Sequence, residues 1–150
     1  MVCRGHPGVQ TQRTFRVKTV FADTSGLYAA LDKRDPFHAE ALELFRRAET
    51  QGWRLVTSSY VVHETWALVQ SRLGWEALDE LLDTLLPACE VVFVGRELHE
   101  AALARCRRER LRELSLTDCV SFELMKQLGL AEAIARDRHF ERERILLPRK

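Results

Sequence analysis

Apolar and polar positions alternate along this chain in blocks that predict a repeated order of strand followed by helix. Short apolar runs bounded by turn residues indicate buried strands, and longer stretches with apolar residues every three or four positions indicate helices. The expected strands are 19–23, 54–57, 90–94, 131–135 and a last edge strand at 145–147. The expected helices cover 24–31, 35–51, 59–69, 75–86, a stretch from about 97, and 116–128.

The connections between the expected strands decide the fold class. They are too long for hairpins, which favours an α/β fold with a mainly parallel sheet covered by helices on both faces. With 150 residues in the chain, we expect one folded domain at 19–150. Residues 1–18 are rich in Gly, Pro, Gln and Thr where they begin, and we expect a flexible leader there.

The charge balance gives little information about partners. A formal net charge of +1 means that any attraction to nucleic acid must come from local groups of Arg. The densest such group is Arg105, Arg107, Arg108, Arg110 and Arg112. Because glutamates are interleaved with it, a solvated helix surface is the stronger interpretation and RNA contact is the alternative.

The cysteines and the apolar runs bear on the compartment. The four cysteines lie far apart, without the close pairs of a zinc site, and we expect free thiols in a reducing compartment. They are Cys3, Cys89, Cys106 and Cys119. No stretch has the apolar core of a signal peptide or the length of a membrane span, so we expect a cytoplasmic protein with no membrane contact.

Four acidic residues from distant segments are expected at one edge of the sheet. Asp23 and Asp137 follow directly on expected strands, and the carboxyl ends of parallel strands share one edge. Glu64 falls in the first turns of the helix after the second strand, and Asp118 opens the helix 116–128. We therefore expect these four side chains to meet there.

Such a group of carboxylates favours metal chemistry. Carboxylates held close together raise one another's pKa unless a cation favours their ionised forms. Ligand sets made only of oxygen suit Mg²⁺ or Mn²⁺, and these ions serve phosphodiester hydrolysis by activating a bound water. The residues thus predict a metal-dependent hydrolase with Asp23, Glu64, Asp118 and Asp137 as metal ligands and catalytic groups. The number of ions and the identity of the general base stay open.

Each acid also has an ordinary structural interpretation. Asp23 can cap the first helix, and Asp118 can form a capping box with Ser115. Glu64 can be a solvated helix residue and Asp137 a turn former. Only the four acids taken together favour a metal site over these alternatives.

Four short motifs, in this order, carry a family resemblance: Phe-Ala-Asp23-Thr-Ser, Ser-Ser-Tyr-Val-Val-His-Glu64, Leu-Thr-Asp118-Cys-Val-Ser-Phe and Asp137-Arg-His-Phe. From about residue 20 to 147 the chain resembles the PIN-domain nucleases, in particular the VapC-type toxins of toxin-antitoxin pairs. The resemblance implies a three-layer α/β/α fold, Mg²⁺- or Mn²⁺-dependent RNA cleavage and homodimerisation. It also implies inhibition by a small cognate antitoxin that inserts into the active-site groove.

One position departs from the pattern of that family. Family members often carry Thr two residues before the fourth acid, where this chain has Ala135. The missing hydroxyl leaves Asp137 either as a direct metal ligand or as a group that acts through water.

Other functions fit the sequence less well or stay open. An aspartyl-phosphate enzyme built on Asp23 would typically have a second Asp at position 25, which is Ser here. A zinc protease helix beginning at His63-Glu64 lacks its second His, since position 67 is Ala. A non-catalytic PIN-fold module that binds RNA or protein, and a PIN nuclease of housekeeping RNA processing, remain alternatives to the toxin. The RNA target, its cleavage sequence and the antitoxin are not specified by the residues.

Overall fold

A four-stranded parallel sheet forms the centre of the protein. The computed structural model describes residues 16–149, and its strands are β1 (Thr19–Ala22), β2 (Arg54–Ser58), β3 (Cys89–Val92) and β4 (Ala133–Ile134). Their spatial order is β3-β2-β1-β4, and every neighbouring pair is parallel. The expected α/β class with a parallel sheet is confirmed.

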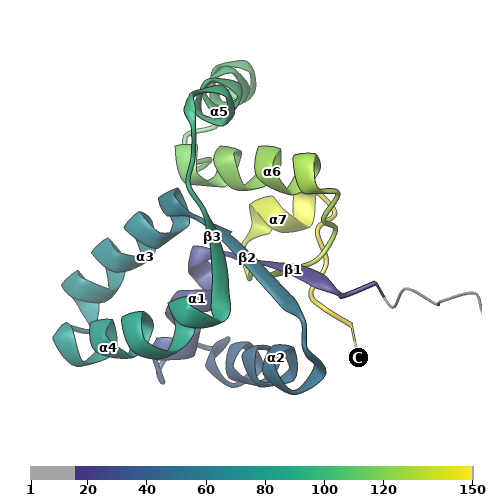
Figure 1. Cartoon of the computed structure of the whole chain (residues 1–150). Coiled ribbons are helices and arrows are strands. Elements are labelled where there is room, and N and C mark those ends of the chain that lie inside the picture. Colours follow the sequence, from purple (N-terminus) through teal and green to yellow (C-terminus); the bar gives the residue numbers. More distant parts are fainter. Residues whose placement is uncertain (1–15, 150) are drawn as a thin grey trace, which may run out of the picture.

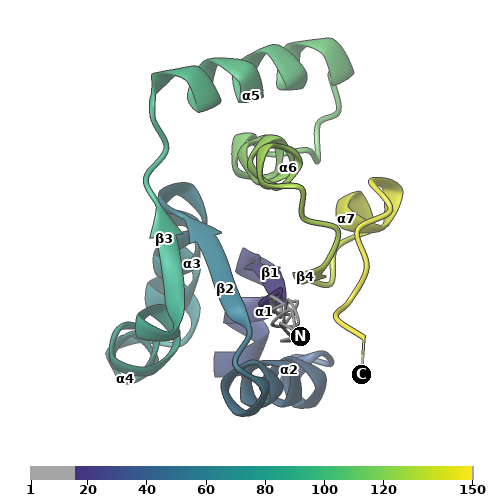
Figure 2. The ribbon, with the colours of Figure 1, turned by 45° about the vertical axis from the view of Figure 1, so that its right-hand side comes forward.

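Helices cover both faces of this sheet. They are α1 (Thr24–Leu31), α2 (His38–Gln51), α3 (Ser59–Arg72), α4 (Trp75–Glu80), α5 (Arg96–Glu109), α6 (Leu116–Leu128) and α7 (Arg138–Arg142). Helices α1 to α4 lie on one side of the sheet and α6 and α7 on the other, with α5 stacked outside α6 (Figures 1 and 2). The three expected layers are therefore present.

Burial of the sheet follows from these layers. Val20, Phe21 and Ala22 of β1 are fully buried because helices cover both sides of this inner strand, which explains its unbroken apolar run. Strand β3 forms one edge of the sheet, and its residues are partly or fully exposed. No helix in the described part of the chain is both long enough and apolar enough to span a membrane.

Two helices are shorter than expected, whereas α3 continues to Arg72, beyond its expected end at 69. The helix expected at 75–86 is α-helical only to Glu80, and a π-helical turn (Leu81–Leu85) and a 3₁₀ turn (Leu86–Ala88) follow. The helix expected from Asp35 begins at His38. In the turn before it, the Asp35 carboxylate accepts a hydrogen bond from the backbone N–H of Phe37 at 2.8 Å.

Four strands are shorter than expected, and the first of them, β1, ends only one residue early, at Ala22. Strand β3 ends at Val92, and the N–H of Val94 then donates to the hydroxyl of Ser59 at 3.0 Å instead of to a strand partner. The run 131–135 gives only the two residues of β4. The expected edge strand at 145–147 reduces to a single parallel bridge between Leu146 and Glu132.

The start of α1 lies very close to β4. A Cβ atom on Gly26 would lie 2.1 Å from the carbonyl oxygen of Ile134, so only glycine permits this approach. The same oxygen accepts a hydrogen bond from the N–H of Asp23 at 3.2 Å. This contact fixes the end of β1 against the segment that leads to Asp137.

Most of the expected leader, residues 1–15, lies outside the described residues. Its last residue, Lys18, is described, and its ammonium lies 3.2 Å from the Glu132 carboxylate. The carbonyl oxygen of Lys18 also accepts the N–H of Arg54 at 2.8 Å, so the backbone here already joins the sheet.

Candidate active site

One pocket of about 300 Å³ is lined by all four acids that the sequence singled out, Asp23, Glu64, Asp118 and Asp137. It lies where β1 and β4 end and where α3 and α6 begin, because each acid follows a strand or lies in the first turns of a helix. The expected meeting of four distant segments at this edge is thus observed.

Asp23 links the end of β1 to the start of α1. Its Oδ2 accepts the N–H of Ser25 at 3.1 Å and the Ser25 hydroxyl at 2.6 Å, which makes it the cap of α1. Only 4% of Asp23 is exposed, and this burial raises its pKa to about 7. The two Ser25 hydrogen bonds oppose that shift, and the charge of Asp118 adds to it.

Asp118 forms the expected capping box at the start of α6. Its Oδ2 accepts the N–H of Ser115 at 3.1 Å, and its own N–H donates to the Ser115 hydroxyl at 3.0 Å. Burial raises the pKa of Asp118, the Ser115 bonds lower it, and the charges of Asp137 and Glu64 raise it further. Two other carboxylates of the pocket therefore disfavour the ionised form of Asp118.

Asp137 and Glu64 reach the pocket from the remaining two segments. Asp137 caps α7, a short helix that the sequence analysis did not predict, and its Oδ1 accepts the N–H of His139 at 2.7 Å. Glu64 lies in α3 and is partly exposed. Three of the four acids thus combine a helix-capping role with a place in the pocket, so their ordinary and functional interpretations are compatible.

Two arginines line the same pocket and were missed by the sequence analysis. Arg72 lies eight residues after Glu64 on the same side of α3, a helical spacing that would have revealed it, and Arg136 directly precedes Asp137. Their guanidinium carbons lie 5.6 Å from the ring centre of Tyr28 and 5.7 Å from that of Phe37, respectively. Within residues 16–149, neither has a carboxylate within 4.0 Å.

The fit of this pocket to a metal ion depends on the donor atoms of its side chains and on how closely they are arranged. Among the described residues, no group of three or more Asp, Glu, His or Cys side chains is already arranged to bind a metal ion. The chemistry of the lining nevertheless suits a hard cation, since its four acidic side chains offer only carboxylate oxygens and burial disfavours the charged forms of Asp23 and Asp118. The Thr24 hydroxyl, in the same lining, is buried and has no hydrogen-bond partner in the described structure, as expected beside a polar ligand.

Comparison with known proteins identifies the family. The PIN-domain family model matches residues 20–145. The chain belongs to the PIN-domain family. Two curated relatives of this PIN domain, from strains CDC 1551 and H37Rv of Mycobacterium tuberculosis, are both named 23S rRNA-specific endonuclease VapC20. Each is 31% identical over 122 residues, which cover 81% of this chain and 91% of the relative.

A solved structure supports the same assignment for this PIN domain. The crystal structure of Mycobacterium tuberculosis VapC20, described as a sarcin-ricin loop cleaving toxin, superposes with a TM-score of 0.74 at 30% identity. The superposition covers 87% of this chain and 99% of the other. The resemblance to VapC-type PIN nucleases, drawn from four short motifs, is therefore confirmed.

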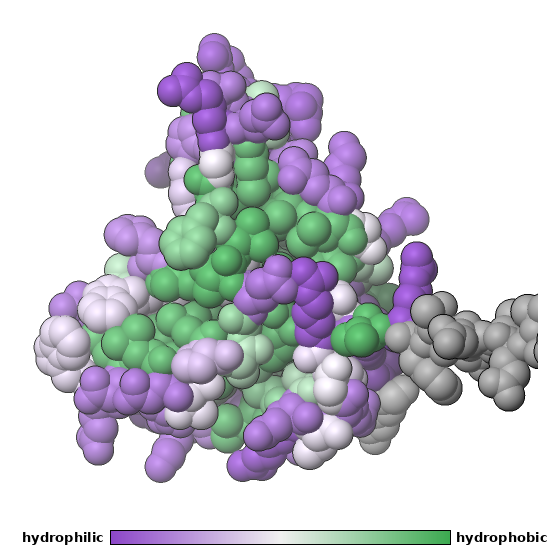
Figure 3. All heavy atoms as spheres, viewed as in Figure 1, coloured by the Kyte–Doolittle hydropathy of each residue, from purple (hydrophilic) through white to green (hydrophobic). Residues whose placement is uncertain are grey.

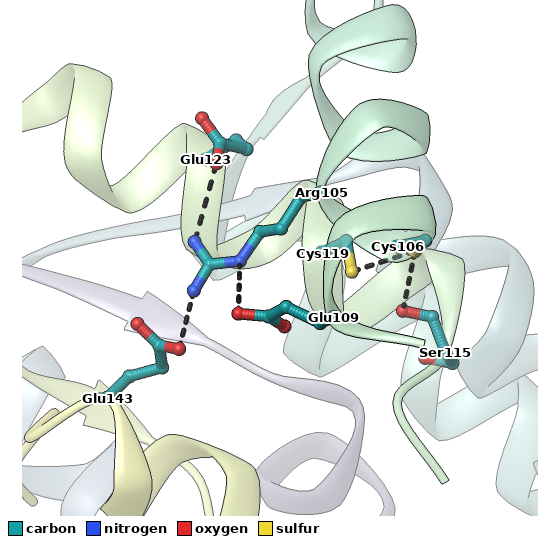
Figure 4. Close-up of polar contacts among 7 residues, drawn as sticks. All are labelled: Arg105, Cys106, Glu109, Ser115, Cys119, Glu123 and Glu143. Atoms are coloured by element: carbon teal, nitrogen blue, oxygen red, sulfur yellow. Dashed lines mark hydrogen bonds and ion pairs between the residues drawn. The ribbon is translucent and has the colours of Figure 1, made fainter. Parts of the chain in front are cut away.

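The five arginines of the basic run 105–112 in this PIN domain differ in how exposed they are. Arg105 is buried and pairs with Glu109 at 3.6 Å, with Glu123 at 3.4 Å and with Glu143 (Figure 4). It therefore joins α5 to α6 and to the end of α7 and is not available to RNA. The remaining four arginines of the run are exposed, Arg107 and Arg108 on α5, and Arg110 and Arg112 in the segment that follows it.

Proposed function

We propose that this PIN domain is a divalent-metal-dependent endoribonuclease that hydrolyses RNA phosphodiester bonds and acts as the toxin of a toxin-antitoxin pair. The observation that carries the proposal is the pocket in which four acids from separate segments face two arginines. A phosphodiester in this pocket would meet carboxylates able to hold a metal ion and cations able to hold its neighbouring phosphates.

Asp23, Glu64, Asp118 and Asp137 would hold Mg²⁺ or Mn²⁺. When bound, such an ion activates a water for attack on phosphorus and neutralises charge in the transition state. The capping hydrogen bonds engage one oxygen of each aspartate, Oδ2 of Asp23, Oδ2 of Asp118 and Oδ1 of Asp137. These bonds fix the carboxylate orientations before substrate arrives, and the other oxygen of each group can then serve as a ligand.

Arg72 and Arg136 would bind phosphates on either side of the scissile bond. They come from α3 and from the β4–α7 segment, and each stacks near an aromatic ring that keeps its guanidinium over the pocket. Guanidinium groups match phosphate oxygens through paired hydrogen bonds. We propose ribosomal RNA as the target class, since the curated relatives are named for 23S rRNA, and the cytoplasm as the place of action.

The decisive experiment is cleavage of defined RNA by the purified protein. Total ribosomal RNA and an oligonucleotide with the sarcin-ricin loop are incubated with Mg²⁺, with Mn²⁺ or with chelator. We expect discrete products only with metal, and at least a hundredfold loss in Asp23→Asn and Glu64→Gln. Equal cleavage in chelator and in both variants would mean that another site or a contaminant acts. Absence of cleavage with retained RNA binding would favour a non-catalytic binding module.

The toxin role requires a small antitoxin that blocks this pocket. We expect a short open reading frame beside this gene whose product co-purifies with the chain and stops RNA cleavage. Expression of the chain alone should arrest growth, and co-expression of that product should restore it. A chain that is harmless alone and has no such neighbour would favour housekeeping RNA processing.

We further propose that the protein is a homodimer through the face that carries β3. An apolar groove there is lined by Val62, Trp66, Leu86, Val91 and Phe93, and 81% of Phe93 is exposed. Figure 3 shows apolar residues gathered along this face between α3 and α5. A second copy would cover both the groove and the unpaired edge of β3. Light scattering should give twice the chain mass, and Phe93→Asp should give the monomer mass.

A further inference from the structure

Two cysteines from neighbouring helices place their sulfur atoms in direct contact. The Sγ of Cys106 on α5 lies 2.8 Å from the Sγ of Cys119 on α6 (Figure 4). This separation is shorter than an ordinary contact between two thiol sulfurs, so a small side-chain rotation would bring them to bonding distance. Both are free thiols in the structure. The sequence predicts free thiols that lie far apart in the chain, and the fold brings these two together.

The two thiols differ in access to solvent. Cys106 is partly exposed, whereas Cys119 is fully buried. A small oxidant would therefore reach Cys106 first, and Cys119 would be positioned to react with the product. This arrangement of an exposed and a resolving thiol is the one that reversible disulfide chemistry needs.

We propose that Cys106 and Cys119 are a redox modification site that closes to an intramolecular disulfide when a low-molecular-weight disulfide, such as oxidised glutathione, accumulates. The Cys106 sulfur loses its proton and attacks the small disulfide, which forms a mixed disulfide and releases one small thiol. The Cys119 sulfur, already in contact with the Cys106 sulfur, then attacks it, and the second small thiol leaves with the proton that Cys119 gives up. Two protein thiols are oxidised and one small disulfide is reduced.

The position of the bond determines its effect. It would join α5 to the first turn of α6, one residue after Asp118, and the Cys106 sulfur already lies 3.9 Å from the carbonyl oxygen of Ser115. Arg105, next to Cys106, holds the same helices together through ion pairs with Glu123 and Glu143. Because the helices are already aligned, the disulfide should form without moving Asp118 and should stabilise the fold.

The expected stabilisation comes from a short closed loop. The bond would enclose the chain between positions 106 and 119 and so restrict the unfolded state. For a loop of this length in a domain of this size we expect a rise in Tm of roughly 5 to 10 °C. We expect oxidation to leave the rate of any RNA cleavage within about twofold, so this site can be tested independently of the proposed nuclease function.

The test uses the purified full chain treated with excess oxidised glutathione under native conditions. Mass spectrometry should show loss of two hydrogens and a peptide pair linked through Cys106 and Cys119, with Tm raised and with both changes reversed by dithiothreitol. Cys106→Ser, a partly exposed position, should abolish the link and the Tm rise. Cys89→Ala, the matched control in β3, should keep both.

Three results would overturn the proposal. The first is a native chain that keeps both thiols free to alkylation after oxidation. The second is linkage of Cys106 to Cys89, to Cys3 or to another molecule in place of Cys119. The third is a linked chain whose Tm does not rise, which would show that the bond distorts the fold. If Cys106→Ser does not fold, Cys106→Ala takes its place. The number of free thiols in the parent chain before and after oxidation then tests the same link.

Discussion

The backbone N–H of Arg136 donates a hydrogen bond to the Ser25 hydroxyl, 3.0 Å away, and thereby joins the two segments that carry Asp23 and Asp137. The same hydroxyl donates to Asp23 Oδ2. Ser25 is therefore a positioning residue that connects one acid to the backbone beside another. Its effect can be measured separately from those of the acids.

Replacing Ser25 should shift the pH dependence of RNA cleavage. The hydrogen bond from the Ser25 hydroxyl lowers the pKa of Asp23, so Ser25→Ala, which keeps only the backbone N–H bond, raises that pKa above its value of about 7. Because a protonated Asp23 cannot hold a cation, the fall of kcat/KM on the acid side should move to higher pH, with about a tenfold loss at pH 7. Ser25→Thr, which keeps the hydroxyl, should restore the profile. An Ala variant with the parental profile would refute this role.

Asp23 should make the metal-free fold less stable as pH rises. Burial raises the pKa of this carboxyl to about 7 in the folded chain, whereas its ordinary pKa, which applies when the chain is unfolded, is 3.8. The free energy of unfolding should therefore fall between about pH 4 and pH 7 and stay low above that range. Above this range the raised pKa of Asp23 lowers the free energy of unfolding by up to about 4 kcal/mol, at 1.36 kcal/mol per pKa unit.

Asp23→Asn removes this titration and keeps a side chain that caps helices well. In chelator at pH 8 the variant should be more stable than the parent in urea, and at pH 4 the two should be nearly equal. Asp83→Asn, at an exposed position, is the control and should change little. A parent whose stability does not depend on pH over this range would contradict the prediction.

Gly26→Ala should destabilise the fold although alanine is the better helix former. Its Cβ would lie 2.1 Å from the Ile134 carbonyl oxygen, and this is backbone that cannot rotate away. We expect a loss of about 2 to 3 kcal/mol in urea unfolding, together with weaker metal binding. Gly95→Ala is the matched control, since nothing lies within 4 Å of its added Cβ. Equal stability of the two variants would show that α1 can move away from β4.

Arg105 should contribute to stability and not to RNA binding. Arg105→Leu would leave Glu109, Glu123 and Glu143 without their common cation at the α5–α6 contact. Because two of these glutamates are about one third exposed, we expect a moderate loss of about 2 kcal/mol. Arg107→Ala, on the exposed part of the run, should leave the unfolding midpoint unchanged. If Arg105→Leu is as stable as the parent and binds RNA weakly, Arg105 binds RNA and does not stabilise the fold.

Arg72 and Arg136 should bind RNA through its phosphates. Arg72→Ala and Arg136→Ala should each raise KM about tenfold and reduce the dependence of KM on salt, with a smaller effect on kcat. Arg46→Ala, an exposed arginine on α2 that does not line the acidic pocket, provides the control. If both variants have the parental KM and salt dependence, the RNA phosphates do not bind at these two arginines.

The sequence patterns that predicted the fold correctly are those with a direct physical cause. Inner strands such as β1 are buried on both faces and so appear as unbroken apolar runs. The capping box of Ser115 and Asp118 is equally visible, because it must satisfy backbone N–H groups at a helix start. The acids could be found because they follow strand ends or open helices, where parallel topology brings them to one edge.

Features that depend on distant neighbours were not visible in the sequence. Strand β4 is short because its pairing stops where the chain turns to Asp137, and α7 has only five residues. The contact between Cys106 and Cys119 depends on how α5 stacks on α6, which no spacing in the sequence expresses. Arg136 was overlooked because a single arginine beside an acid is also common on ordinary surfaces.

The helix-capping role of Asp23, Asp118 and Asp137 has a consequence for evolution. Loss of any one by most substitutions removes hydrogen bonds at a helix start along with a carboxylate of the pocket, so the fold and the chemistry of the pocket change together. Asparagine is the exception, because it still accepts the backbone N–H while it gives up the negative charge. A descendant that keeps the fold and the surface around the pocket while it loses one negative charge of the pocket is thus a single-residue change away.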